Sequence, residues 1–136
     1  MKDAKKTADC FLIASGLKEY IEDERSSLIE AAEMNDINTV ISSSMGRLFD
    51  AAASILGICH ENVFEGECAS RLEKEAKIVD NKKMTCEYAG FEIHEENGMI
   101  ISDPAPVLTY LCSQKSNREK SDNNKNNKGR AALGFH

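Results

Sequence analysis

Apolar residues in the first third of the chain recur at helical spacing. They share one predicted helix face, opposite a run of Glu and Asp side chains, and they are Leu17, Tyr20, Ile21, Leu28, Ile29 and Ala32. Residues 35–38 read Asn-Asp-Ile-Asn. Because Asn and Asp side chains compete with the backbone for hydrogen bonds, this stretch predicts a break in the helix.

The clearest helical pattern follows that break. Residues 42–44 are all serine and supply N-cap candidates. The next apolar positions recur three and four apart, at Met45, Leu48, Phe49, Ala52, Ile55 and Leu56. Three alanines at 51–53 favour helix and allow close packing, and Gly57 is expected to weaken the C-terminal end. A loop is predicted over 58–67. A further helix over 67–78 should place Cys68, Leu72 and Ala76 on one side.

The period of the pattern then changes from helical to alternating. The residues that predict a β-hairpin are Cys86, Tyr88, Phe91 and Ile93, followed after a turn by Met99, Ile100 and Ile101. Asn97-Gly98 is a favoured hairpin turn, because both central residues need a positive φ. Asp103 and Pro104 then predict the N-cap and first position of a helix. That helix continues through Val107, Leu108 and Leu111.

The end of the chain has a different composition. Residues 113–128 are rich in Asn, Lys and Ser, and predict a disordered, low-complexity linker. Residues 129–136 resume an apolar pattern and predict the start of a truncated helix. The domain organisation is therefore a main domain over 1–112, a linker over 113–128 and a helix start over 129–136. The fold class is α+β, a mainly helical lobe with one small hairpin.

Composition narrows the class of protein. The chain has 136 residues, 41% hydrophobic and 29% charged, which fits one globular domain. It contains no run of 18 apolar residues and no secretory signal, so we expect no membrane partner and a cytoplasmic location. The net charge is −6, although residues 113–130 carry six Lys or Arg residues against only Glu119 and Asp122. An acidic body argues against a nucleic-acid partner.

The cysteines and histidines suggest little chemistry by their spacing. Five cysteines, an odd number, contain no Cys-x-x-Cys pair, so we expect neither a disulfide framework nor a zinc finger. Most of them are interpreted as buried small residues or free thiols. Cys59 and His60 could suggest a nucleophile or a metal ligand, but no base or third ligand lies at a supporting spacing. We predict no metal site and no catalytic residue in this chain.

A polar pair lies within the predicted helix that begins near Met45. Arg47 and Asp50 are three residues apart and share a face. They are either an exposed ion pair, worth under about 1 kcal/mol, or a carboxylate that points into a cleft. Gly46, near the start of the helix, could allow the close approach of a bulky group. Gly66 is equally ambiguous from its position alone.

A longer motif reduces this ambiguity. Residues 43–51 read Ser-Ser-Met-Gly-Arg-Leu-Phe-Asp-Ala, Leu-Gly follows at 56–57, and residues 64–67 read Phe-Glu-Gly-Glu. The combination closely resembles the hydrogenase maturation carbamoyltransferases of the HypF type. It is less similar to the tRNA threonylcarbamoyl transferases, which share the actin/hexokinase-like ATPase fold. The match is strongest over residues 43–76.

The resemblance implies a function. Such proteins use carbamoyl phosphate and ATP to form carbamoyl adenylate. They then carbamoylate the C-terminal Cys of a HypE-type partner protein during nickel–iron hydrogenase maturation. By resemblance, Asp50 contacts the ribose of the nucleotide, Gly66 lets the backbone approach it, and Gly46 and Arg47 are close neighbours.

The resemblance also implies what this stretch of sequence lacks. The family's metal site needs a His-x-x-x-His pair and a later aspartate, which this chain does not contain, so the chain is expected to be inactive alone. Two alternatives stay open, a non-catalytic helical interaction module or gene remnant, and a transfer domain of the tRNA threonylcarbamoyl type. As part of a larger lobe, the chain is also expected to expose Leu108, Leu111 and Phe135, and so to dimerise or aggregate.

Overall fold

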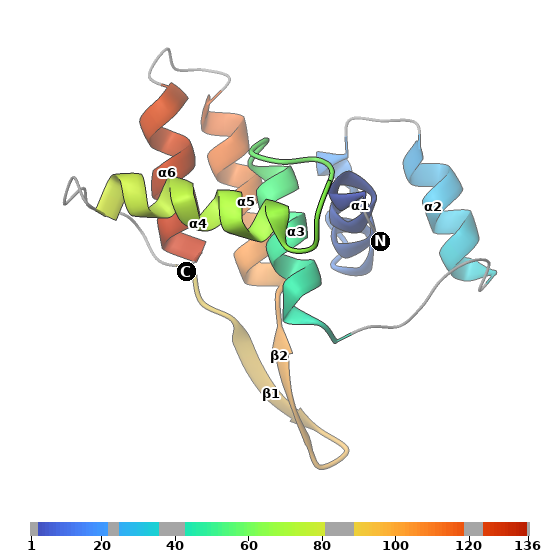
Figure 1. Cartoon of the computed structure of the whole chain (residues 1–136). Helices are drawn as coiled ribbons and strands as arrows, with labels where there is room; N and C mark the ends of the chain where they lie inside the picture. Colours follow the sequence, from blue (N-terminus) through green and yellow to red (C-terminus); the bar gives the residue numbers. More distant parts are fainter. Residues whose placement is uncertain (1–2, 22–24, 36–42, 81–88, 119–123, 136) are drawn as a thin grey trace.

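The computed structural model describes residues 3–21, 25–35, 43–80, 89–118 and 124–135. In these ranges the chain forms a helical body and one protruding two-stranded antiparallel sheet (Figure 1). This arrangement confirms the α+β prediction of a mainly helical lobe with a small hairpin. Within the described ranges, no helix combines the length and apolar character needed to cross a bilayer.

The N-terminal third contains separate helical segments rather than one long helix. Helix α1 spans Ala4–Ala14, the 3-10 turn η1 spans Lys18–Tyr20, and helix α2 spans Arg25–Met34. The Asp3 carboxylate caps α1 by accepting a hydrogen bond from the Lys6 backbone N–H. The predicted break at 35–38 agrees with the end of α2, although residues 36–38 lie outside the described ranges.

Helices α3 and α4 form the centre of the body. Helix α3 spans Met45–Ile55 and α4 spans Glu67–Asp80, close to the predicted ranges. Ser44 is the N-cap residue of α3, and Ser42 lies outside the described ranges. Helix α3 packs against α1 on one side and α4 on another. The alanines at 51–53 are fully buried, and such small side chains allow three helices to approach closely.

The hairpin forms where the alternating pattern predicts it. Strand β1 spans Glu92–Glu96 and β2 spans Met99–Asp103, with Glu96 opposite Met99. Asn97 and Gly98 both have positive φ, at 52° and 78°, which confirms the predicted turn. The predicted contributions of Cys86 and Tyr88 lie outside the described residues.

Two helices complete the body. Helix α5 spans Ala105–Arg118 and begins one residue later than predicted. The Asp103 carboxylate still accepts a hydrogen bond from the Ala105 N–H at 2.8 Å. Helix α6 spans Asn124–Phe135 and packs against α4 and α5.

The prediction of a disordered linker at 113–128 is wrong for the residues that the structure describes. Residues 113–118 continue α5, and residues 124–128 form the first turns of α6. The polar sequence misled the interpretation, because tertiary packing stabilises a helix beyond its own propensity. One such contact is the hydrogen bond from Lys128 Nζ to the Gly57 carbonyl oxygen, 2.7 Å.

Residues 129–135 are the second half of a docked helix rather than the start of one. Gly129 is buried where α6 crosses α4, and a Cβ atom there would lie 2.7 Å from the Glu75 carbonyl oxygen. Phe135 packs edge-to-face against Phe49 of α3, with 5.3 Å between ring centroids. Since Leu108 and Leu111 are fully buried and Phe135 is nearly so, the expected exposure of these three residues is wrong.

Candidate functional site

Helix α3 carries three of the four predicted site residues. Asp50 is buried at 7% exposure, although its helix begins at an exposed end. Its Oδ2 atom lies 3.8 Å from Arg47 Nη1, and the Arg47 side chain is about two-fifths exposed. The predicted pairing one helical turn apart is therefore present but loose. The Asp50 carboxylate is therefore not in a fully exposed ion pair, as expected for a surface pair, and it is not without a charged neighbour.

The loop between α3 and α4 begins with a tight helix end. Gly57 has a φ of +61°, which a residue without a Cβ adopts at little cost. Its N–H donates to the Ser54 carbonyl oxygen, and the Ile58 N–H donates to that of Ala53, each at 2.9 Å. This pair of bonds is a Schellman motif, which satisfies the last carbonyls of the helix. The chain turns back sharply toward α1 as a result.

The middle of the loop is tied to α1. The His60 carbonyl oxygen accepts hydrogen bonds from the Ala4 and Lys5 N–H groups at 2.9 and 3.2 Å. The His60 ring Nδ1 also lies 3.0 Å from the Ser54 hydroxyl. These contacts give His60 a structural role at the α1–α3 junction. No cluster of three or more His, Cys, Asp or Glu side chains that could hold a metal occurs within the described ranges.

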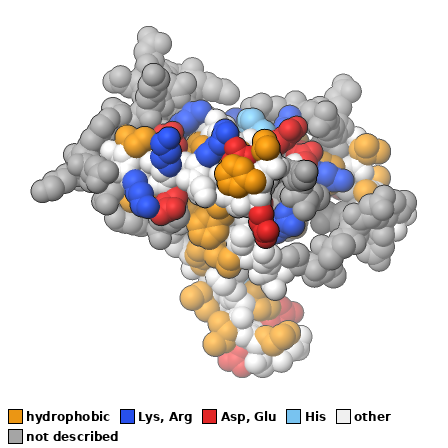
Figure 2. All heavy atoms as spheres, in the orientation of Figure 1, with side chains coloured by type: hydrophobic (Ala, Val, Ile, Leu, Met, Phe, Trp, Pro, Cys, Tyr) orange, Lys and Arg blue, Asp and Glu red, His pale blue; other side chains and the backbone are white. Residues whose placement is uncertain are grey.

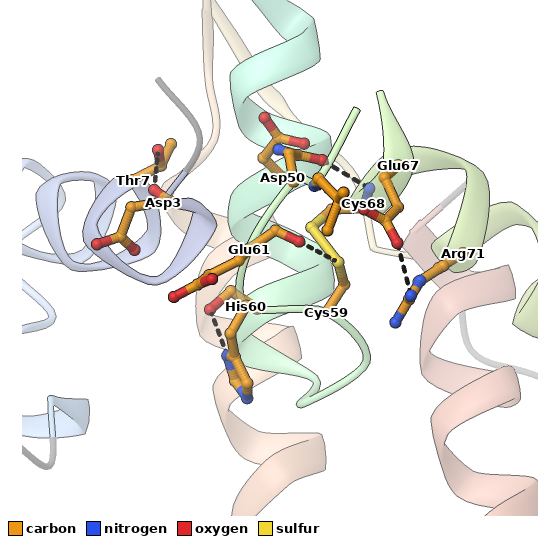
Figure 3. The surroundings of a disulfide bond; sticks show 12 residues. Asp3, Thr7, Asp50, Cys59, His60, Glu61, Glu67, Cys68 and Arg71 are labelled. Carbon is orange, nitrogen blue, oxygen red and sulfur yellow. Dashed lines mark hydrogen bonds and ion pairs between the residues drawn. A yellow bond between two sulfur atoms is a disulfide. The ribbon is translucent and has the colours of Figure 1, made fainter. Parts of the chain in front are cut away.

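The loop is closed by a disulfide between Cys59 and Cys68 (Figure 3). The two Cα atoms are 5.2 Å apart, a normal separation for this bond, and both residues are buried. The expectation of no disulfide is therefore wrong for this pair, although the expected burial of the cysteines holds for both. Among the described cysteines, Cys10 and Cys112 lie outside this disulfide. Burial raises the pKa of the Cys112 thiol to about 11, so that thiol stays protonated near neutral pH.

The start of α4 is held by polar contacts from the same loop. The Asn62 side chain accepts a hydrogen bond from the Cys68 N–H at 2.8 Å. The buried Glu67 carboxylate accepts one from the Val63 N–H at 2.7 Å and pairs with Arg71 at 2.5 Å. The Val63 hydrogen bond lowers the pKa of Glu67 below its usual value. Burial opposes that shift, and the Arg71 charge supports it.

The two glycines of the predicted site differ in whether their backbone conformation favours glycine. Gly66 has a φ of +77°, and no atom of the chain lies within 4 Å of the position that a Cβ would occupy. Its backbone conformation, rather than crowding within the chain, is what favours glycine there. Gly46 is exposed, and a Cβ there would make only an ordinary contact with the Ser44 hydroxyl at 3.6 Å. Neither glycine is required by packing against another part of this chain.

The arrangement brings the two halves of the sequence motif together. Helices α3 and α4 pack against each other, and Figure 3 places Asp50 on α3 beside the start of α4, where Glu67 and Cys68 lie. Gly66 immediately precedes that helix. Asn62, Glu67 and Arg71 had no predicted role. The sequence does contain a signal for Glu67, because an acidic residue at a helix start with an Arg one turn later is a stabilising pattern. The role of Asn62 could not be predicted, because it depends on the path of the loop.

These features define a helical unit whose polar residues gather around one disulfide-closed loop. The sequence of residues 3–133 matches the family described as "Carbamoyltransferase, Kae1-like Domain, second subdomain". The match covers nearly the whole chain, so the protein belongs to this carbamoyltransferase family.

Two curated relatives agree with that assignment. The chain is 34% identical over 74 residues to the carbamoyltransferase HypF of Synechocystis sp., which covers 54% of this chain and 9% of the relative. It is 60% identical over 38 residues to the carbamoyltransferase HypF of Rhodobacter capsulatus, covering 27% of this chain and 5% of that relative. The matched regions therefore span less than a tenth of each relative. No solved structure matches significantly.

Proposed function

We propose that this chain supplies one wall of the nucleotide site of a HypF-type carbamoyltransferase. The family assignment supports the reaction class, and the packing of α3 against the start of α4 supports the location. In this proposal the ATPase-like domain uses carbamoyl phosphate and ATP to form carbamoyl adenylate. It then carbamoylates the C-terminal Cys of a HypE-type partner in cytoplasmic nickel–iron hydrogenase maturation.

Asp50 is the residue on which the proposed site depends most. A carboxylate can accept two hydrogen bonds from neighbouring hydroxyl groups, as the ribose of a nucleotide presents. The carboxylate of Asp50 has low exposure, and its partner Arg47 stands 3.8 Å away. Since 3.8 Å is too long for a hydrogen bond, a ribose hydroxyl can approach the carboxylate without displacing a hydrogen bond between these two side chains.

Gly66 and the loop before it have a supporting role in this proposal. The open space beside Gly66 leaves room for a ligand to approach the backbone. The disulfide and the contacts of Asn62 and Glu67 hold that backbone in place. A pre-ordered wall reduces the conformational entropy lost on binding. Gly46 and Arg47 lie at the same end of α3 and complete the proposed nucleotide-contacting set.

Calorimetric titration of the full chain with a non-hydrolysable ATP analogue tests the proposal. We expect measurable binding, weakened at least about tenfold in Asp50→Asn, which keeps the side-chain size but removes the charge. Glu73→Gln is the matched control, because it removes an exposed carboxylate on α4 that pairs with Lys77. It should bind like the wild type.

Each result has a defined meaning. Equal binding by the wild type and Asp50→Asn would contradict the role of Asp50. An absence of binding by a chain that melts cooperatively would contradict a nucleotide wall formed by this subdomain alone. Loss of binding in both variants would point to a general charge effect rather than a site.

A non-catalytic interaction module is the second candidate, and one observation favours it. The hairpin exposes large apolar side chains that the body does not cover, Ile93, Met99 and Ile100. Such surface in a monomer often marks a contact with another protein. This candidate and the nucleotide wall involve different regions of the molecule and do not exclude each other.

A further inference from the structure

The β1–β2 hairpin packs little against the helices that the structure describes. It extends away from the helical body (Figure 1), and Figure 2 shows hydrophobic side chains gathered along it. Ile93, Met99 and Ile100 are 69%, 62% and 81% exposed. A two-stranded hairpin alone is at best marginally stable in water, and additional strands stabilise it.

The two edges of this sheet differ in charge. Strand β1 carries Glu92, Glu95 and Glu96, whereas β2 has no charged residue before its last position, Asp103. Charged side chains on an edge strand discourage pairing with another strand, and like charges directly opposite each other are destabilising. Charge therefore disfavours pairing of another strand with the β1 edge, which we call the guarded edge. Among the residues that the structure describes, the β2 edge lacks this protection, and we call it the open edge.

The register of the hairpin determines which backbone groups face the open edge. In a two-residue hairpin the pair that flanks the turn, here Glu96 and Met99, exchanges both hydrogen bonds, and bonded pairs then alternate. Met99, Ile101 and Asp103 therefore direct their N–H and C=O groups toward β1. Ile100 and Ser102 direct theirs outward, away from β1.

We propose that the open edge of β2 pairs with β2 of a second copy of this chain. A two-fold axis beside Ile101 places Ile100 of each copy opposite Ser102 of the other. Both residues direct their backbone groups outward, so these are correctly formed antiparallel bonded pairs. The seam is self-complementary, as a two-fold interface requires, and it keeps all six glutamates of the two β1 strands on the outside.

The same register also pairs the exposed side chains. The two Ile101 side chains meet in the closely spaced, non-bonded position at the axis. On the other face, Ile93 and Ile100 of one hairpin are diagonal neighbours, and the pairing joins them to the same two residues of the second copy. A stripe of four isoleucines results, and two separate hairpins become one four-stranded sheet.

The expected affinity is low. Two paired strands of five residues bury much less than the roughly 1,200–2,000 Å² of stable protein complexes. The dimer should therefore form and dissociate with concentration. The body is not involved, so the pairing is independent of the proposed nucleotide site.

Sedimentation equilibrium of the full chain over a wide concentration range tests the proposal. The wild type should follow a monomer–dimer equilibrium. Ser102→Pro removes an N–H that faces away from β1, so it spares the hairpin and should raise the dimer Kd at least about tenfold. Glu95→Pro is the matched control, because the Glu95 N–H faces outward from the guarded edge, and its dimer Kd should equal that of the wild type.

Hydrogen exchange gives a second reading that needs no variant. The amides of Ile100 and Ser102 should become protected as concentration rises, while those of Ile93 and Glu95 should not. A monomer at every concentration would overturn the proposal and leave the edge to a strand of a different protein. A dimer that survives Ser102→Pro, or protection of the β1 edge instead, would overturn it as well.

Discussion

The core of the helical body and the β1–β2 hairpin differ in the exposure of their apolar residues. In the body, Leu56, Leu72, Leu108 and Leu111 are completely buried, whereas most of the isoleucine and methionine side chains of the hairpin face solvent. Both regions have regular backbone, and both follow the local sequence pattern. Local pattern is thus enough to form an element, but burial of its apolar face depends on what other elements supply.

Truncation of one buried and one exposed side chain should separate the two regions most clearly. Leu72→Ala removes a fully buried side chain of α4 and should lower the free energy of unfolding by about 2–5 kcal/mol. Ile100→Ala on the hairpin should change it by less than about 0.5 kcal/mol. Urea unfolding followed by circular dichroism measures both, below the concentration at which the chain dimerises. Similar losses in the two variants would mean that the hairpin packs on the body in solution.

Reduction of the disulfide should affect the body alone. The bond closes a loop with a sequence separation of 9, and a loop of this length corresponds to about 2–3 kcal/mol of stability. A reductant should therefore lower the urea midpoint of the wild type. The variant with both Cys59→Ser and Cys68→Ser should have the lower urea midpoint even without reductant, and reductant should not change that midpoint. Five free thiols titrated in the unreduced, unfolded wild type would rule out the bond.

Acid should destabilise the start of α4. The pKa of Glu67 is lower in the folded chain than its usual value of 4.5, so its contacts stabilise the fold above pH 4.5 and are lost progressively as pH falls below it. Glu67→Gln should be slightly less stable at neutral pH and should lose less stability on acidification. The pH dependence of the melting temperature measures this difference. Parallel curves for the wild type and the variant would show that Glu67 does not contribute.

The sequence predicted the elements whose side chains follow a simple period. Helix α3, helix α4 and the Asn97-Gly98 turn could be found because their residues satisfy local rules. The pairing of Arg47 with Asp50 could be found for the same reason, since three residues make nearly one helical turn. The family motif located the candidate site, whereas periodicity alone left its purpose open.

The features that sequence reasoning missed depend on contacts between distant parts of the chain. The first turns of α6 are polar and resemble a linker, yet Gly129 and Lys128 dock that helix on α4 and on the end of α3. Cys59 and Cys68 lie at an uninformative spacing, and they meet because the Schellman motif at Gly57 turns the loop back. The lesson is physical, since a pattern describes neighbours along the chain and not the path of a loop.

The contact between Phe49 and Phe135 has a consequence for how the molecule assembles during synthesis. The two rings are in contact, although most of the length of the sequence separates them. The ribosome adds roughly 5–20 residues per second. Helix α3 therefore emerges several seconds before its aromatic partner exists. During that interval the Phe49 ring lacks its Phe135 contact, and the packing of α3 against α6 can form only after α6 has been synthesised.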